Sequence, residues 1–351
     1  MLRASLITLG DPQQLTGGFL YHRRMAAAAA THDATLRFVS CRDMVFPVGA
    51  FAARRALGDA AEGSDVVVID SIAAWMLAPW VRRDAAPPLV VMSHQVPGGI
   101  DHGRVRSVCQ ARLDVWTYRR ARLLMVASGT LADDLRSRGF AAEVIRVVAP
   151  GRDPAEPSDP VPELRAGRRA AVLCVGNWMP RKGIVELLDA IALLPDQAAT
   201  LHLVGDEHLV PGYERRVLRR LEDPALHDRV VRHGPIPAAR VAAMYRAADV
   251  FALPSTTEPY GTVIGEAIAA GLPVVGWDAG NLPHLVAHGV EGLIVPVGDV
   301  AGLASALRRL TEDEEYRSAL AAAAGRRGAM LPTWEDTAQT FFDHLRDAAA
   351  G

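Results

Sequence analysis

Residues 170–183 read AAVLCVGNWMPRKG and show the pattern of a strand, a loop and the start of a helix. The apolar run Ala170–Val175 predicts a buried strand, a short loop follows, and a helical pattern starts at Ile184. Arg181 and Lys182 therefore lie at a strand-to-helix junction. Free backbone N–H groups and the helix dipole favour anions at such junctions.

Lys182 is the only lysine among 38 basic residues, and all the others are arginine. In a chain that otherwise uses arginine for every positive charge, we expect the one lysine to lie where a guanidinium does not fit. The alternative is the chance survival of one surface lysine. The compact ammonium and the planar guanidinium differ most at sites that enclose phosphate. We therefore predict that Lys182 binds a phosphate group.

Strand and helix patterns alternate along the whole chain outward from this stretch. In the first half, strands are predicted at residues 1–9, 36–40, 66–70, 89–94, 123–128 and 144–148. In the second half, they are predicted at residues 170–175, 200–204, 230–233, 250–253, 273–276 and 292–295. This alternation predicts parallel sheets with right-handed crossovers, and so an α/β fold of two Rossmann-like domains. Ligands of such sheets bind outside the carboxyl ends of the strands.

A proline-rich stretch at residues 150–162 separates the two halves, because proline cannot join a sheet interior. We expect an N-terminal domain over residues 1–150 and a linker over 151–168. A second Rossmann-like domain is expected over 169–331. Residues 332–351 are expected to form a closing helix.

Composition limits the class of protein. The chain has 351 residues, 50% of them hydrophobic and 22% charged, which is typical of a globular protein with two domains. Three dispersed cysteines, no transmembrane-length apolar run and no signal-peptide pattern indicate a cytoplasmic setting. The formal net charge of −2 argues against a dedicated nucleic-acid binder.

The charge is distributed unevenly between the halves. Residues 1–150 hold 18 arginines against 13 acidic residues, whereas residues 151–351 hold 20 basic against 27 acidic residues. Solvated helix faces explain most of this difference. The first half nevertheless suits an anionic acceptor or a membrane surface.

The densest motif covers residues 255–275 and follows a predicted strand. Gly261 removes side-chain bulk where a helix starts, and the N–H groups of Thr262 and Val263 are free to bind a diphosphate. Glu258 precedes the helix and can reach a sugar hydroxyl, while Glu266 lies one turn inside and can accept hydrogen bonds from ribose. Each glutamate alone is unspecific, but two glutamates at this spacing around Pro-Tyr-Gly are a far more specific pattern.

This motif resembles the Glu-x7-Glu motif of the retaining glycosyltransferases of family 4, which have the GT-B fold of two Rossmann-like domains facing a central cleft. The resemblance covers nearly the whole chain. Gly17 and Gly18 resemble the family's N-terminal glycine loop, and His94 resembles a histidine beside the donor sugar. The closing helix from Trp334 would cross back to the N-terminal domain, as the family's last helix does.

Residues 175–183 resemble the family's diphosphate-binding loop, and residues 278–283 resemble its later glycine-rich loop. Asn177 departs from the pattern, because the family usually has arginine there. His284 also replaces a common glutamate. Arg181 is the neighbouring cation that could replace the missing charge on the diphosphate.

The resemblance implies transfer of a sugar from a nucleoside diphosphate, with a UDP-sugar as the first candidate donor and a GDP-sugar as the second. It assigns catalytic roles to His94, Lys182 and Glu258. The expected donor site consists of Gly17, Gly18, Asn177, Arg181, Lys182, Glu258, Tyr260, Gly261, Thr262, Val263 and Glu266. We expect no metal, because no Asp-x-Asp is present, and no cofactor, because the nucleotide sugar is a substrate.

The acceptor would bind the N-terminal domain. Arg23 and Arg24 follow the glycine loop and could hold a phosphate or carboxylate, and Gln95 follows His94. Small-molecule, glycan and lipid-linked acceptors all remain open as partners. Peripheral contact with the inner face of a membrane also remains open, whereas a nucleic-acid partner is not expected.

Three other classes of protein share a Rossmann-like fold. A Rossmann dehydrogenase needs Gly-x-Gly-x-x-Gly after the first strand, and residues 9–12 lack it. A sugar-nucleotide epimerase or phosphorylase of the same fold remains the nearest rival. A catalytically weak nucleotide-binding paralogue is supported only by Asn177 and opposed by Lys182, Glu258 and Glu266.

Overall fold

The computed structural model describes residues 1–10, 17–41, 48–100, 103–153 and 162–351. Their contacts divide the chain into two compact units. Unit 1 contains residues 1–151 together with 332–351, and unit 2 contains residues 152–331. Part of the expected linker, residues 154–161, lies outside the described residues.

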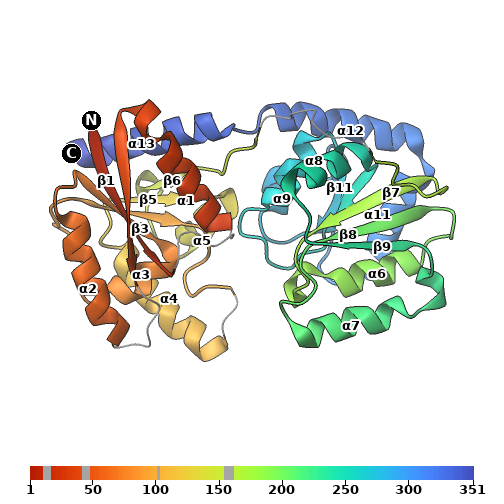
Figure 1. Cartoon of the computed structure of the whole chain (residues 1–351), viewed down its shortest axis with the longest axis horizontal. Helices are drawn as coiled ribbons and strands as arrows, with labels where there is room; N and C mark the ends of the chain where they lie inside the picture. Colours follow the sequence, from red (N-terminus) through yellow and green to blue (C-terminus); the bar gives the residue numbers. More distant parts are fainter. Residues whose placement is uncertain (11–16, 42–47, 101–102, 154–161) are drawn as a thin grey trace. The chain divides into compact units, whose positions relative to one another are not determined.

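Unit 1 is built on a six-stranded parallel sheet in the order β2-β1-β3-β4-β5-β6. Its strands are β1 (Leu2–Leu9), β2 (Ala34–Cys41), β3 (Val66–Asp70), β4 (Leu89–Ser93), β5 (Leu123–Val126) and β6 (Ile145–Val147). Its helices are α1 (Gly17–Ala28), α2 (Val48–Ala61), α3 (Ser71–Leu77), α4 (Arg104–Tyr118), α5 (Gly129–Ser137) and α13 (Trp334–Ala350). These helices cover both faces of the sheet (Figure 1).

Unit 2 repeats this architecture with a sheet in the order β12-β11-β10-β7-β8-β9. Its strands are β7 (Ala170–Val175), β8 (Ala199–Val204), β9 (Val230–Gly234), β10 (Val250–Ala252), β11 (Val274–Trp277) and β12 (Gly292–Val295). Its helices are α6 (Ile184–Ala192), α7 (Pro211–Leu221), α8 (Ala238–Ala247), α9 (Thr262–Ala269), α10 (Leu282–Leu285), α11 (Val300–Glu312) and α12 (Glu314–Ala329). The predicted fold class of two Rossmann-like α/β domains is confirmed.

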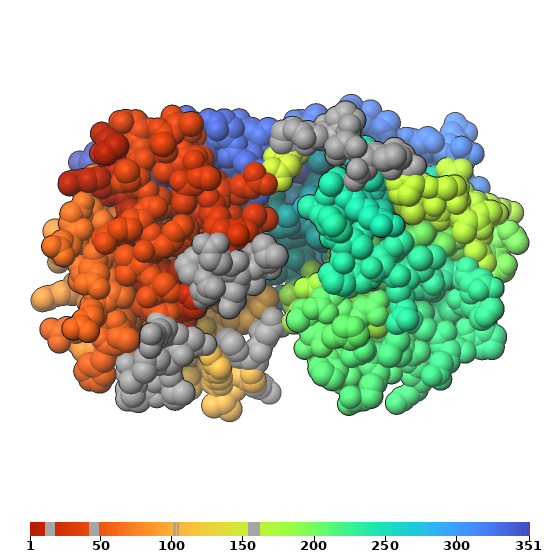
Figure 2. All heavy atoms as spheres, viewed as in Figure 1, coloured from red at the N-terminus to blue at the C-terminus, as the bar shows by residue number. Residues whose placement is uncertain are grey.

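Helix α13 belongs to unit 1, although unit 2 separates it from the rest of that unit in sequence. Thr333 and Asp336 form a capping box at its start. Its Phe341 and Phe342 are fully buried, and Thr337 donates a hydrogen bond to the carbonyl of Ala149 at 2.9 Å. Figure 2 shows these C-terminal residues, in blue, beside the red N-terminal residues of the same unit.

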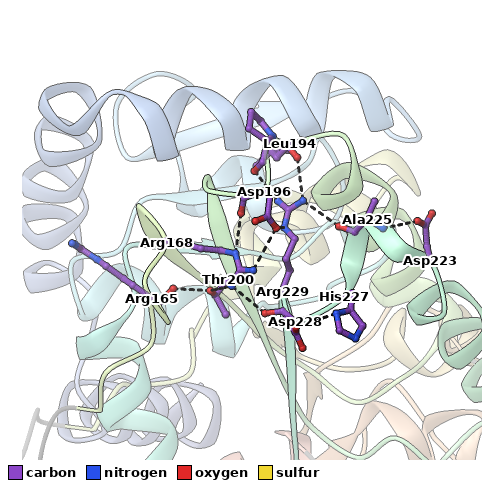
Figure 3. Close-up of polar contacts among 11 residues, drawn as sticks. Arg165, Arg168, Leu194, Asp196, Thr200, Asp223, Ala225, His227, Asp228 and Arg229 are labelled. Carbon is purple, nitrogen blue, oxygen red and sulfur yellow. Dashed lines mark hydrogen bonds and ion pairs between the residues drawn. The ribbon is translucent and has the colours of Figure 1, made fainter.

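Arg168 and Arg229 form hydrogen bonds with backbone carbonyls near the amino ends of strands β7, β8 and β9 (Figure 3). Arg229 is 2% exposed and donates hydrogen bonds of 3.1–3.2 Å to the carbonyls of Leu194, Pro195 and Ala225. Arg168 donates to the carbonyl of Asp228 at 3.0 Å. Because ligands of parallel sheets bind at the carboxyl ends, this arginine cluster has a structural role at the opposite edge.

The sheet orders identify one switch point in each unit. In unit 1 the chain reverses its direction of winding between β1 and β3, and in unit 2 between β7 and β10. The loops after these four strands are therefore the favoured places for a ligand. Three of the predicted site segments lie there or beside them: the α1 start, residues 176–183 and residues 253–261.

Candidate active site

Lys182 lies at the switch point of unit 2, in the turn between β7 and α6. It is 8% exposed, and its Nζ forms an ion pair with Oε2 of Glu258 from the loop after β10. The stem of Lys182 passes close to Gly176, because a Cβ there would lie 3.6 Å from Lys182 Cδ and Cε. A glycine at 176 thus leaves room for the lysine stem.

The two loops of the switch point are bonded directly to each other. The carbonyl of Arg181 accepts hydrogen bonds from Thr256 N–H at 2.8 Å and from the Ser255 hydroxyl at 2.9 Å. Gly183 has φ +68°, and a Cβ there would lie 2.2 Å from the carbonyl oxygen of Pro254. Only glycine permits this close approach of the loops.

Arg181 supplies a second cation beside Lys182. Its Nη1 lies 3.8 Å from Oε2 of Glu258 and donates a hydrogen bond of 3.1 Å to the carbonyl of Thr257. Glu258 is therefore held by two positive charges, and its side chain is 14% exposed. These three residues, each predicted for the donor site, are brought together by the fold.

The start of helix α9 lies next to this charge cluster. Gly261 precedes the helix with φ +84°, a conformation that favours glycine, and Thr262 begins the helix. The N–H groups of Thr262 and Val263 belong to the first turn and have no acceptor within the helix. This part of the site therefore offers hydrogen-bond donors to an anion.

The loop at residues 278–281 packs against the backbone of the segment that contains Glu258. Asn281, which is 2% exposed, donates a backbone hydrogen bond of 2.8 Å to the carbonyl of Glu258 and a side-chain bond of 2.7 Å to that of Tyr260. Gly280 has φ +56°, and a Cβ there would lie 2.6 Å from the backbone nitrogen of Glu258. Residues 278–281 thus fix the backbone on which Glu258 and Tyr260 stand.

Glu266 lies on α9 and accepts a hydrogen bond of 3.1 Å from the hydroxyl of Tyr245. Glu266 is an exposed residue, but partial burial of its carboxylate raises its pKa, against the opposing effect of the Tyr245 hydrogen bond. The exposure leaves the carboxylate open to a ligand. Burial, and then the charge of Glu266, raise the pKa of Tyr260 to about 12, so this phenol stays protonated.

Asn177 has a structural partner. Its side-chain oxygen accepts a hydrogen bond of 2.9 Å from the backbone N–H of Asp206, in the loop after β8. Trp178 N–H donates to the carbonyl of Asp206 at 2.8 Å. Asn177 thus joins two loops of unit 2, and the cations beside Glu258 are Arg181 and Lys182.

In unit 1, His94 is the first residue after β4, one position beyond the observed end of the predicted strand. Its backbone N–H donates to the Ser71 hydroxyl at 3.2 Å. Its Nε2 is buried and makes no hydrogen bond among the described residues. Gly18 lies against the ring, because a Cβ at Gly18 would be 3.5 Å from His94 Cδ2, while Gly17 begins α1. The fold therefore brings Gly18 and His94 together.

The predicted acceptor residues lie on or near the same elements. The guanidinium of Arg24 stacks 5.5 Å from the centroid of the Trp334 ring. Arg23 Nε is buried and makes no hydrogen bond within the described part of the chain. The carbonyl of Gln95 accepts a hydrogen bond of 2.8 Å from the Ser93 hydroxyl. Their predicted contact with an acceptor stays a prediction.

Comparison with known proteins gives family matches for both halves of the chain. The family model "Glycosyl transferase 4-like domain" matches residues 4–151, and "Glycosyl transferases group 1" matches residues 169–313. A D-inositol 3-phosphate glycosyltransferase of Corynebacterium jeikeium is 30% identical over 286 residues, which is 76% of this chain and 67% of that protein.

The chain belongs to glycosyltransferase family 4.

Another relative of this family 4 glycosyltransferase is the GDP-mannose-dependent alpha-(1-6)-phosphatidylinositol monomannoside mannosyltransferase of Mycobacterium tuberculosis. It is 33% identical over 210 residues, covering 56% of this chain and 53% of that protein. The chain spans about half to two thirds of the length of the curated relatives that it matches.

Solved structures share the fold of this glycosyltransferase along its whole length. Sucrose-phosphate synthase from Thermosynechococcus elongatus superposes with a TM-score of 0.83 at 23% identity, covering 100% of both chains. Anabaena HepE in complex with UDP and glucose gives a TM-score of 0.78 at 22% identity, covering 99% of this chain and 100% of the other. Both are similar in fold, which is GT-B.

Sequence reasoning missed three residues that lie against the predicted site residues: His22, Asp70 and Tyr245. Asp70 ends an otherwise apolar strand next to a switch point, and this position could have identified it as a candidate site residue. His22 and Tyr245 lie inside helices α1 and α8, and no motif in the neighbouring sequence marks either residue as part of a site.

No cluster of three or more histidine, cysteine, aspartate or glutamate side chains suited to a metal ion occurs in the described ranges. In the same ranges, no helix combines the length and apolar character that a membrane span requires.

Proposed function

We propose that this glycosyltransferase transfers a sugar from a nucleoside diphosphate to an acceptor hydroxyl, with retention of anomeric configuration and without a metal ion. The observation that carries the proposal is the buried Lys182–Glu258 pair at the switch point, with Arg181 beside it and the start of α9 next to it. These groups offer positive charge and N–H donors in place of a metal.

Departure of the diphosphate increases negative charge on its oxygens. Preorganised cations and N–H groups stabilise that charge without reorganisation, and each such donor contributes about 3–4 kcal/mol to many enzymes' transition states. In the proposed mechanism, Lys182 bridges Glu258 and the diphosphate, and Thr262 and Val263 N–H groups bind the second phosphate. The departing phosphate takes the acceptor's proton on the same face of the sugar, so that no protein base is needed.

The remaining predicted residues position the donor. Glu266, held by Tyr245, accepts hydrogen bonds from ribose, and His94 contacts the sugar. We propose UDP as the first carrier and GDP as the second; the mycobacterial relative is named for GDP-mannose. An acceptor with a phosphate group fits the arginine-rich unit 1, and two relatives are named for inositol phosphate compounds.

The test is a thermal-shift panel of UDP, GDP, ADP and TDP, followed by transfer assays with sugars of the base that binds. Retention predicts a product whose anomeric configuration, read by NMR, equals that of the donor. EDTA should leave the rate unchanged. Sugar isomerisation without an acceptor would identify an epimerase instead, and the absence of any nucleotide binding would favour an inactive paralogue.

We also propose that helix α4 contacts an anionic membrane surface. Val105, Val108 and Trp116 on this helix are 80%, 48% and 52% exposed, and the guanidinium of Arg120 stacks 3.6 Å from the Trp116 ring centroid. Asp114, the only acidic residue of α4, is buried. Amphipathic basic helices with tryptophan bind anionic interfaces. Co-sedimentation with phosphatidylglycerol vesicles should exceed that with phosphatidylcholine and fall in a V105D/W116E variant; equal binding would contradict the proposal.

A further inference from the structure

A buried tyrosine of unit 2, Tyr245 on α8, contacts helix α9 at two points. It is 4% exposed, and its ring packs against the ring of Phe251 on β10, with the centroids 5.8 Å apart. Its hydroxyl lies 3.1 Å from Oε2 of Glu266 and 3.2 Å from the carbonyl oxygen of Val263. Because a hydroxyl carries one proton, these two acceptors share it. The tyrosine thereby ties the Glu266 carboxylate to the first turn of its own helix.

The two carboxylate oxygens of Glu266 differ in their partners. Oε2 is held by Tyr245, whereas Oε1 makes no hydrogen bond with the residues that the structure describes. An ionised carboxylate offers about four acceptor positions, and the tyrosine occupies one of them. Since Glu266 is an exposed residue, the others are open to the hydroxyls of a ligand. An acceptor oriented before the ligand arrives loses less conformational freedom on binding.

The charge of Glu266 depends on the same contact. Among the described residues, the titratable groups that interact with its carboxylate are Tyr245, Tyr260 and Asp153. Burial raises the pKa of Glu266, the hydrogen bond from Tyr245 lowers it, and Asp153 raises it. Burial, and then the charge of Glu266, raise the pKa of Tyr245 well above its ordinary value, so this hydroxyl stays a donor. Loss of the hydroxyl would therefore remove the effect that opposes burial and Asp153.

We propose that Tyr245 is a positioning residue that holds the Glu266 carboxylate toward the two hydroxyls of the donor's ribose, and so makes the site selective for ribonucleotides over their deoxy forms. A carboxylate fixed to accept a hydroxyl loses that partner outright when the hydroxyl is missing. A carboxylate that is free to turn to water loses less. This role rests on the proposed function, because it requires a bound nucleotide.

Isothermal titration calorimetry of the intact chain compares UDP with 2′-deoxy-UDP and 3′-deoxy-UDP, or GDP with its two deoxy forms if GDP is the nucleotide that binds. In the wild type, at least one deoxy form should bind about tenfold more weakly or worse, the effect of losing a hydrogen bond to a charged group. In Y245F, that penalty should fall to about threefold or less. The matched control is Y213F, which removes another buried hydroxyl of unit 2, one that accepts from the Val185 N–H at 3.2 Å. It should leave the penalty unchanged.

Carbon NMR of the Glu266 carboxyl, with E266Q for assignment, provides a readout that needs no nucleotide. In Y245F the midpoint of its titration should rise above that of the wild type, because the hydrogen bond that favours the charged form is gone. UDP affinity requires that charged form, so on acidification it should fall at a higher pH in Y245F than in the wild type. If Y245F does not fold, Tyr245→3-fluorotyrosine nearly keeps the size of the ring and makes the hydroxyl a stronger donor. It should lower the midpoint.

An undiminished deoxy penalty in Y245F, or a Glu266 midpoint that neither Tyr245 variant moves, overturns the proposal. An equal loss of selectivity in Y213F overturns it as well, because the effect would then follow from general destabilisation. If the wild type binds no nucleotide, the proposed function fails and this role fails with it. If the wild type and Y245F discriminate equally between UDP and its deoxy forms, the role of Tyr245 alone fails.

Discussion

Replacement of Lys182 tests the central element of the site. The side chain has two parts with separate structural effects: a stem against Gly176 and an ammonium paired with Glu258. Lys182→Ala removes both. Lys182→Arg keeps the charge but places a larger planar group in a space that is 8% exposed and bounded by the Gly176 backbone.

The structure sets the size of the expected effects. Loss of one preorganised donor at a developing oxyanion costs about 3–4 kcal/mol, which corresponds to a fall in turnover of about 10²–10³-fold in Lys182→Ala. The same change leaves Glu258 with Arg181 alone at 3.8 Å. Breaking a buried pair costs about 3–5 kcal/mol of stability, and the 10% and 14% exposure of the two side chains favours the lower end. Lys182→Arg should recover only part of either loss.

The assay compares turnover of the three proteins at saturating donor, with circular dichroism and thermal unfolding as folding controls. Arg232→Ala provides the matched control, because Arg232 also pairs with a glutamate, Glu207, at 3.1 Å, but its side chain is 44% exposed. That variant should turn over like the wild type. A double-mutant cycle with Glu258→Ala should show strong non-additivity, as expected for residues in contact.

Full turnover in Lys182→Ala would refute the phosphate site itself. Full turnover in Lys182→Arg would refute the narrower argument that the site distinguishes an ammonium from a guanidinium. Additive effects of the Lys182 and Glu258 changes would show that the ion pair does not link the two residues functionally.

Four further variants test other parts of the structure. Glu266→Ala should raise the donor KM about tenfold with the unfolding temperature unchanged, because its carboxylate is open to a ligand; an unchanged KM would remove it from the donor site. His94→Ala should lower turnover at least 100-fold and leave nucleotide affinity, measured by calorimetry, nearly intact; parallel loss of both would indicate a structural role. Gly183→Ala should destabilise unit 2 by at least about 1–2 kcal/mol in urea unfolding, because of its left-handed backbone and the contact with Pro254; wild-type stability would contradict the close approach. Arg229→Met should cost about 3 kcal/mol in the same assay, since three backbone carbonyls lose their charged donor, whereas turnover of the folded fraction should be unchanged.

The sequence predicted the elements well where the signal is local. The apolar runs at 66–70 and 170–175 coincide with β3 and β7, and the closing helix begins at Trp334 as expected. Strand ends were less accurate: His94 and residues 127–128 were included in strands that end earlier. The apolar pattern does not distinguish the last paired residue from the first residue of the loop.

The sequence singled out Lys182 and Glu258 for the predicted donor site, because both stand in dense motifs of glycine and charge. Their ion pair was not predicted, since 76 residues separate them and only the fold brings them together. The contacts of Tyr245 with Glu266 and of His22 with Asp70 were not predicted for the same reason. Each pair joins two elements whose side chains, taken alone, match ordinary helix or strand positions.

The return of α13 to unit 1 has a consequence for the order in which a ribosome-bound chain can fold. Residues 152–331 are contiguous, so unit 2 leaves the ribosome whole, whereas unit 1 must wait for Phe341, Phe342 and Leu345, which are fully buried in it. At translation rates of about 5–20 residues per second, the interval between Gly151 and Trp334 lasts roughly 10–40 s. During that time the apolar site for α13 is open to chaperones and to other nascent chains. The last unit to be completed is therefore the one whose synthesis began first.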